Sequence, residues 1–174
     1  MKARVSLFVV VALLVAFASV SACADDLIVG GGWAYFDWYA GPGVWATPTF
    51  SLSADDTCTV QITDAFLTGD QFEVYVDGIL EITTSATPDG LALGASTGDD
   101  AWAELAYSRG CFVLNAGKYE IKIKNIQIPT GYPDGGAYIR ALDGVVPCVP
   151  EPSSVVALVS GLGGVLGLAW RRRS

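Results

Sequence analysis

Apolar and polar residues alternate along three segments in the middle of the chain. Between residues 71 and 76 every second side chain is apolar, and residues 57–63 and 118–124 repeat the pattern. Because successive side chains of an extended strand point to opposite faces, this period of two predicts strands with one buried and one solvated face. Beyond residue 124 the apolar positions change parity, which predicts a β-bulge at Lys124–Asn125.

Turn residues separate these strands. Asp77-Gly78 follows the run 71–76 and predicts a two-residue hairpin with a type I′ turn, which leads into a second strand over 79–83. Residues 83–100 are rich in Gly, Asp, Ser and Thr and have no period, so we expect a long loop there. Many short strands without a helical period predict an all-β domain, an antiparallel β-sandwich of jelly-roll type.

The first 24 residues differ from the alternating domain. Lys2 and Arg4 precede an uncharged apolar stretch over 5–20 and then a zone of small residues, the pattern of a secretory signal peptide that signal peptidase removes. Two forms of processing stay open, lipidation of Cys23 at a lipobox-like sequence or cleavage after residue 24. Either form leaves a β-sandwich domain over residues 25–146 in an oxidising compartment.

Residues 147–174 form a third segment. An uncharged stretch over 155–170 precedes Arg171, Arg172 and Arg173. A helix of that length spans about 24 Å, less than the roughly 30 Å of a hydrocarbon core, and flanking residues make up the difference by snorkelling. Arginines beside an apolar helix favour the cytoplasmic side, so the domain would lie outside, in agreement with the signal peptide.

The motif Pro150, Glu151 and Pro152, followed by the apolar segment and the arginine cluster, resembles a PEP-CTERM sorting signal. Proteins with such tails are exported by Gram-negative bacteria, and membrane proteases called exosortases recognise them. The resemblance implies an exosortase-type protease as partner and a transmembrane helix over 155–170 that holds the protein in the inner membrane before processing. It further implies a final location at the cell surface or in the extracellular matrix, with polysaccharide as a candidate partner.

A second resemblance covers the domain, over about residues 33–142. Several short segments resemble a recurring domain of exported PEP-CTERM proteins, which has similar secreted relatives in fungi. The resemblance implies the fold and the exported location, and it implies no catalytic residue. The matching segments are 63–66, 69–74, Asp77-Gly78, Ser108-x-Gly110 and 135–140.

Charge and composition reduce the number of function classes that the domain could belong to. The chain has 18 Asp and Glu against 10 Lys and Arg, a net charge of −8, and half of the basic residues lie in the terminal segments. Such an acidic domain would repel nucleic acid. The absence of histidine excludes Ser-His-Asp and Cys-His nucleophiles and histidine zinc sites. We therefore expect a non-enzymatic surface protein; the alternatives are a carbohydrate-binding module and, third, a glycoside hydrolase with a carboxylate pair.

The chain has four cysteines, of which Cys23 is removed or lipidated. Three thiols remain in an oxidising compartment, so one disulfide can form. We expect it between Cys58 and Cys111, because both lie in the domain whereas Cys148 lies in the linker that follows. The alternative is that all three thiols are free.

Acidic residues supply one candidate site. Asp55, Asp56, Asp64 and Asp70 fall mostly at turns, and loop oxygens are the ligands that calcium prefers. The alternative is that these residues only initiate turns. Calcium is therefore the single candidate cofactor; otherwise we expect none.

Aromatic residues supply a second candidate site. Trp33, Trp38 and Trp45 lie close together in the N-terminal part of the domain. Exposed rings of this kind stack on sugar faces, which would make them a carbohydrate-binding surface. The alternative is that they fill the core of the sandwich or cover its rim.

Overall fold

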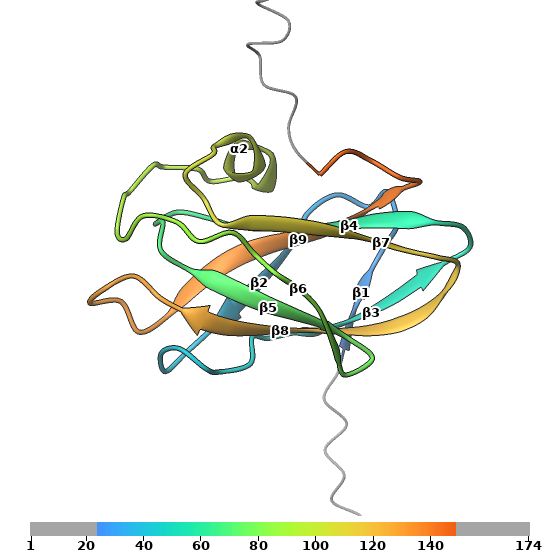
Figure 1. The fold of residues 1–174 in the computed structure, drawn as a ribbon, viewed down its shortest axis with the longest axis horizontal. Coiled ribbons are helices and arrows are strands. Elements are labelled where there is room, and N and C mark those ends of the chain that lie inside the picture. The colour runs from blue at the N-terminus through green and yellow to red at the C-terminus, as the bar shows by residue number, and fades with distance from the viewer. Residues whose placement is uncertain (1–23, 149–174) are drawn as a thin grey trace, which may run out of the picture.

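The computed structural model describes residues 24–148, which form a β-sandwich with a short helix over one face (Figure 1). One sheet has five strands in the order β1-β3-β8-β5-β6, and the other has four in the order β2-β9-β4-β7. All paired strands are antiparallel except β1 with β3, which confirms the predicted antiparallel-rich sandwich. The elements are β1 (Ala24–Leu27), β2 (Ala34–Trp38), β3 (Thr49–Ala54), β4 (Cys58–Asp64), β5 (Gln71–Val76), β6 (Ile79–Thr83), α2 (Gly98–Ala103), β7 (Arg109–Leu114), β8 (Gly117–Gln127) and β9 (Gly135–Asp143).

Alternating side chains from the two sheets meet in the core. In β5 the apolar residues at 72, 74 and 76 are buried and the residues between them are half-buried, as the period of two predicts. Phe72 packs edge to face against Phe36 and Trp38 of β2, in the opposite sheet, with ring centroids 5.5 and 5.1 Å apart. These aromatic contacts join the two layers, and Trp38 is a core residue.

The predicted hairpin is confirmed. Asp77 and Gly78 have positive φ angles of 50° and 81°, as a type I′ turn requires. Strands β5 and β6 leave this turn as antiparallel neighbours, with Val76 opposite Ile79. The expected long loop is present but ends at Thr97, before the predicted residue 100, because the Thr97 hydroxyl accepts a hydrogen bond from the Asp100 N–H and caps α2.

The bulge in β8 lies next to its predicted position. Strand β5 pairs with β8 so that Gln71 faces Gln127 and Phe72 faces Asn125, which leaves Ile126 as the extra residue. Asn125 therefore stays on the inward side of β8, in line with the two buried isoleucines before it. The bulge thus places a polar side chain where the strand pattern otherwise puts an apolar one.

Strand β4 is buried along its whole length and on both faces. Its outer face lies beneath α2, which an arginine links to the sheet. Arg140 donates from Nε to Oε1 of Gln61 (2.9 Å), pairs through Nη1 with Asp99 of α2 (2.8 Å), and lies over the ring of Trp33 at 4.1 Å. The outward polar residues Thr59 and Gln61 are therefore buried because other segments cover them and satisfy their hydrogen bonds.

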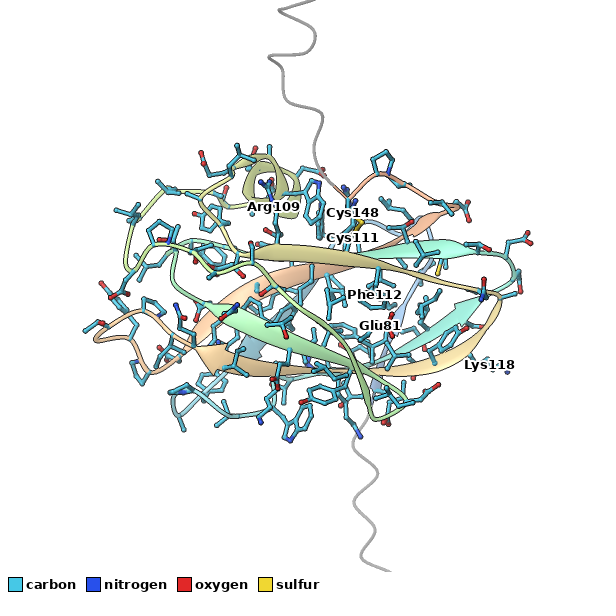
Figure 2. All side chains as sticks on the ribbon, viewed as in Figure 1. Glu81, Arg109, Cys111, Phe112, Lys118 and Cys148 are labelled. Atoms are coloured by element: carbon cyan, nitrogen blue, oxygen red, sulfur yellow. A yellow bond between two sulfur atoms is a disulfide. The ribbon has the colours of Figure 1, made fainter. Side chains whose placement is uncertain are left out.

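Residues 144–148 cross the outer face of β4 and are called here the C-terminal strap. The Thr59 hydroxyl donates to the Gly144 carbonyl (2.7 Å) and accepts a hydrogen bond from the Val146 N–H (2.9 Å). A disulfide joins Cys111 of β7 to Cys148 at the end of the strap. Figure 2 shows both cysteines on the outer side of the four-stranded sheet. The end of the described chain is thus covalently fixed to the domain.

The expected disulfide between Cys58 and Cys111 is wrong. Strand β4 pairs with β7 so that Cys58 faces Leu114 and Gln61 faces Cys111. Residues paired across two strands point to the same face, so the two cysteines lie on opposite faces of the sheet. Cys58 is a free thiol in the core, where burial raises its pKa.

Replacing Gly78 tests the hairpin. Gly78→Val puts a β-branched residue at a φ of 81°, and we expect it to lower the free energy of unfolding by about 1–3 kcal/mol. The strain is in the backbone, because a Cβ at this position would meet no atom within 4 Å. Glu73→Gln on the half-exposed face of β5 is the control, and its effect should stay within about ±0.5 kcal/mol. Denaturant melts of the two variants measure the difference, and the reverse ranking would contradict the strand register.

Candidate functional site

A cleft of about 290 Å³ opens at the end of the sandwich where β4 leads into β5. One wall is the connection 65–69, and the opposite wall is the loop 128–134 between β8 and β9. Its aromatic and acidic lining residues are Phe66, Tyr132, Asp70 and Asp134. The cleft therefore combines apolar rings with carboxyl groups, a common composition for small-molecule sites.

The wall at 65–69 has an unusual backbone. Phe66 has a φ of 65°, in the left-handed region that bulky residues rarely adopt. Thr68 fixes the segment to the long loop, because its hydroxyl donates to the Pro88 carbonyl (2.7 Å) and accepts from the Leu91 N–H (3.0 Å). The result is that the Phe66 ring faces outward, with 43% of its surface exposed.

An aromatic row runs from the cleft over the four-stranded sheet. Phe66 lies 6.1 Å from Tyr138, and Tyr138 lies 5.7 Å from Tyr35, measured between ring centroids. Tyr35 and Tyr138 are opposite each other in β2 and β9, so pairing of the strands holds their rings together. Tyr132 adds a half-exposed ring on the other wall of the cleft.

Three polar side chains, of which Asp70 lines the cleft, are called here the acidic cluster: Asp64, Asp70 and Asn125. Asp64 ends β4, Asp70 directly precedes β5, and Asn125 lies in β8 beside its bulge; all three are buried. Asp64 Oδ1 accepts a hydrogen bond from the Ala65 N–H (2.7 Å), and Asn125 Nδ2 donates to Asp70 Oδ1 (3.2 Å). Asn125 Oδ1 has no hydrogen-bond partner, whereas the carboxyl groups of Asp64 and Asp70 lie close enough to share a hydrogen bond.

Burial dominates the electrostatics of this cluster. Desolvation raises the pKa of Asp64, and the nearby Asp70 carboxylate raises it further. Desolvation also raises the pKa of Asp70, although hydrogen bonds from the Asn125 amide and from Asp64 partly offset the shift. The two carboxyl groups therefore do not both ionise freely near neutral pH.

The structure brings only some of the predicted calcium residues together. Asp64 and Asp70 meet in the acidic cluster, whereas Asp55 and Asp56 lie in the turn before β4, about 20 Å away along that strand. Within residues 24–148, no group of three or more His, Cys, Asp or Glu side chains is placed to hold a metal. Sequence reasoning missed Asn125, although its inward position in an apolar stripe was a readable signal.

The three tryptophans do not form one surface. Trp38 is 1% exposed and belongs to the core, so its candidate role in a sugar-binding surface is wrong and the alternative, a core position, is confirmed for this residue. Trp33 is covered by Arg140 and donates from Nε1 to Asp99 (2.9 Å). Trp45 is 52% exposed but lies against Tyr75 on the five-stranded sheet. Phe66 and Tyr138, which extend the aromatic row from the cleft, were not among the residues predicted for sugar binding.

Comparison with known proteins identifies the tail. Residues 149–173 match the family model of the PEP-CTERM protein-sorting motif, which confirms the resemblance noted above. The motif marks an exported protein that an exosortase-type membrane enzyme processes, with sorting to the cell surface. The chain is thus a β-sandwich protein that carries a PEP-CTERM sorting motif.

Other comparisons add little on function. Among solved structures, the chain matches the pre-peptidase C-terminal domain of a collagenase from Bacillus anthracis at 10% sequence identity and a TM-score of 0.36, over 68% of this chain and 94% of that one. No curated protein matches the sequence. Residues 24–148 include no helix with the length and apolar character that crossing a membrane requires.

Several predictions for the two ends fall outside the described residues. They concern the signal peptide, lipidation of Cys23, the sorting motif Pro150–Pro152, the apolar helix over 155–170 and the terminal arginines. The sequence match to the sorting motif bears on the last three.

Proposed function

We propose that the chain is a non-enzymatic surface or extracellular-matrix protein of a Gram-negative bacterium, displayed through exosortase sorting. The observation that carries this proposal is the order of features along the chain. The sorting motif begins at residue 149, directly after Cys148, the residue that the disulfide fixes to the domain. The sandwich is therefore the domain that is exported and displayed, and the motif is the signal through which the exosortase recognises and processes the protein.

The C-terminal strap suits this role. Its hydrogen bonds to Thr59 and the disulfide to Cys111 hold the last described residues against the outer face of β4. A disulfide that closes a loop of this length stabilises a domain by about 2–4 kcal/mol. The described chain begins and ends on opposite sides of the sandwich (Figure 1), so removal of the signal peptide and processing of the tail act on separate faces.

Features of the acidic cluster support a role other than hydrolysis. Its two carboxyl groups lie within hydrogen-bonding reach of each other, whereas the carboxyl groups of glycosidases are about 5–9.5 Å apart. Asp64 has no exposed surface, so a substrate in the cleft has no direct access to it. The missing histidine removes the commonest general base.

Carbohydrate binding is the second candidate, and the aromatic row beside the cleft favours it. Phe66, Tyr138 and Tyr35 present neighbouring rings, with Tyr132 across the cleft. Sugar rings stack on such surfaces through their apolar faces, and the carboxylate of Asp134 would accept hydrogen bonds from hydroxyl groups. A matrix polysaccharide is the ligand class that fits both the cleft and the exported location.

The mass of the mature protein tests the sorting proposal. We expect protein isolated from its native host to lack Arg171–Arg173, because an exosortase removes or exchanges the tail. A variant that ends at residue 149 should be released in soluble form with its domain folded, as circular dichroism would report. Mature protein that keeps the three arginines would contradict sorting and indicate a permanent membrane anchor.

Glycan binding tests the second candidate. On an array of bacterial polysaccharides, we expect Tyr132→Ala to reduce binding at least tenfold, since loss of a stacking ring removes a large part of the contact. Trp45→Ala is the matched control, because this ring is exposed on the opposite sheet. Binding that depends on Trp45 and not on Tyr132 would move the site to the five-stranded sheet; no binding by the wild type would remove this candidate.

A further inference from the structure

Asp64 and Asp70 lie at the two ends of the connection 65–69, which forms one wall of the cleft. Asp64 is 0% exposed and Asp70 is 4% exposed. The Asp64 carboxyl group accepts hydrogen bonds from the Ala65 N–H (2.7 Å) and from the Asp70 N–H, and the two carboxyl groups lie close enough to share a further one. The connection is therefore a loop that two buried acidic side chains close at its base.

A hydrogen bond between these two groups needs a proton. An ionised carboxylate accepts hydrogen bonds and donates none, so the groups bond to each other only while at least one of them is protonated. Asn125 of the five-stranded sheet donates from Nδ2 to Oδ1 of Asp70 (3.2 Å) and so occupies only one of its two oxygen atoms. When both groups are ionised, repulsion between two buried negative charges replaces the shared hydrogen bond.

The side chains around the pair do not compensate these charges. Within residues 24–148, neither of the two ion pairs involves Asp64 or Asp70. Arg109 of β7 pairs with the residue before Asp64, but its guanidinium donates to the Trp102 carbonyl (2.7 Å) and lies over the Trp102 ring. The titratable side chains near the pair or along the wall are acidic or phenolic: Glu104, Tyr107, Asp89 and Asp134.

We propose that Asp64 and Asp70 form a pH-sensitive latch, which closes the base of the wall 65–69 while the two carboxyl groups share a proton and opens when both are ionised. Solvent reaches the pair through Asp70, which lines the cleft. The wall carries Phe66 at a φ of 65°, and its other attachments are the Thr68 hydrogen bonds to the long loop and a bond from Gln127 Nε2 to the Gly69 carbonyl (3.0 Å). The latch stands apart from sorting by exosortase and does not depend on the glycan proposal.

The direction of the pH dependence follows from linkage. Burial raises the pKa of both carboxyl groups above the value of about 4 that they have in an unfolded chain. The latch therefore contributes its full stability below the unfolded pKa, and this contribution is lost as the pH rises through the raised values. The chain has no histidine, so no side chain with an ordinary pKa changes its charge between about pH 5 and 8.

Thermal unfolding of the full chain in detergent tests the latch. Between about pH 6 and 9 we expect the melting temperature of the wild type to fall by about 5 °C or more, the shift that loss of one bound proton over a pH unit produces. Infrared spectra at about pH 6.5 should show the carbonyl stretch of a protonated carboxyl group, because ordinary carboxyl groups are ionised there. A constant melting temperature, or the absence of this band, would overturn the proposal.

Two variants that keep the shape of the side chain separate the latch from a purely structural role. In Asp70→Asn and in Asp64→Asn an amide N–H donates to the remaining carboxylate at every pH, so the hydrogen bond no longer needs a proton. We expect each variant to lose the infrared band and the fall in melting temperature. Asp134→Asn, on the opposite wall of the cleft, is the control and should keep both. A fall that survives in either folded variant, or one that disappears in Asp134→Asn, would overturn the assignment to this pair.

Discussion

Burial of β4 on both faces is the constraint on which the rest of the structure depends. Its inward residues Cys58, Val60 and Ile62 belong to the core between the sheets. Its outward residues are polar, and each needs a cover that also forms hydrogen bonds. The C-terminal strap bonds to Thr59, and the Arg140 link to α2 bonds to Gln61. The small helix and the end of the domain are therefore positioned by the polar face of one strand.

The same strand positions the site. Asp64 is its last residue, and the chain turns there into the connection that forms one wall of the cleft. An ionised carboxylate at such a place is costly, which is why its pKa is raised. A structure that keeps two such groups together gives up stability, and retention of costly polar groups in a cleft is typical of a functional site.

Much of the fold could be predicted from the sequence because local patterns determine it. The period of two over 71–76 correctly identified the buried face of β5, opposite a half-buried one, and Asp77-Gly78 identified the turn, because few residues tolerate its φ angles. The disulfide could not be predicted in this way. Whether Cys111 can reach Cys58 or Cys148 depends on the register between β4 and β7, and this register follows from tertiary packing.

The candidate site was likewise predicted only in part from the sequence. Asp64 and Asp70 were singled out as turn residues near β5, and they do meet. The prediction that Asp55 and Asp56 lie in the same site is wrong. These residues are close to Asp64 in the sequence, but an extended strand of about 20 Å separates them from it in space. Asn125 and the position of Tyr138 in the aromatic row were missed, since each depends on the pairing of strands that lie far apart in the sequence. Composition alone could not decide between a core position and a sugar platform for Trp38, because the size of its ring suits both, and the structure places it in the core.

Peptide mapping of the full chain under non-reducing conditions tests the central claim most directly, namely that the strap closes the outer face of β4 and fixes the domain to its sorting motif. The account predicts one cross-linked peptide that joins Cys111 to Cys148, with Cys58 alkylated only after denaturation. A peptide that joins Cys58 to either of the other two would contradict the register of β4 and β7 and the position of the strap.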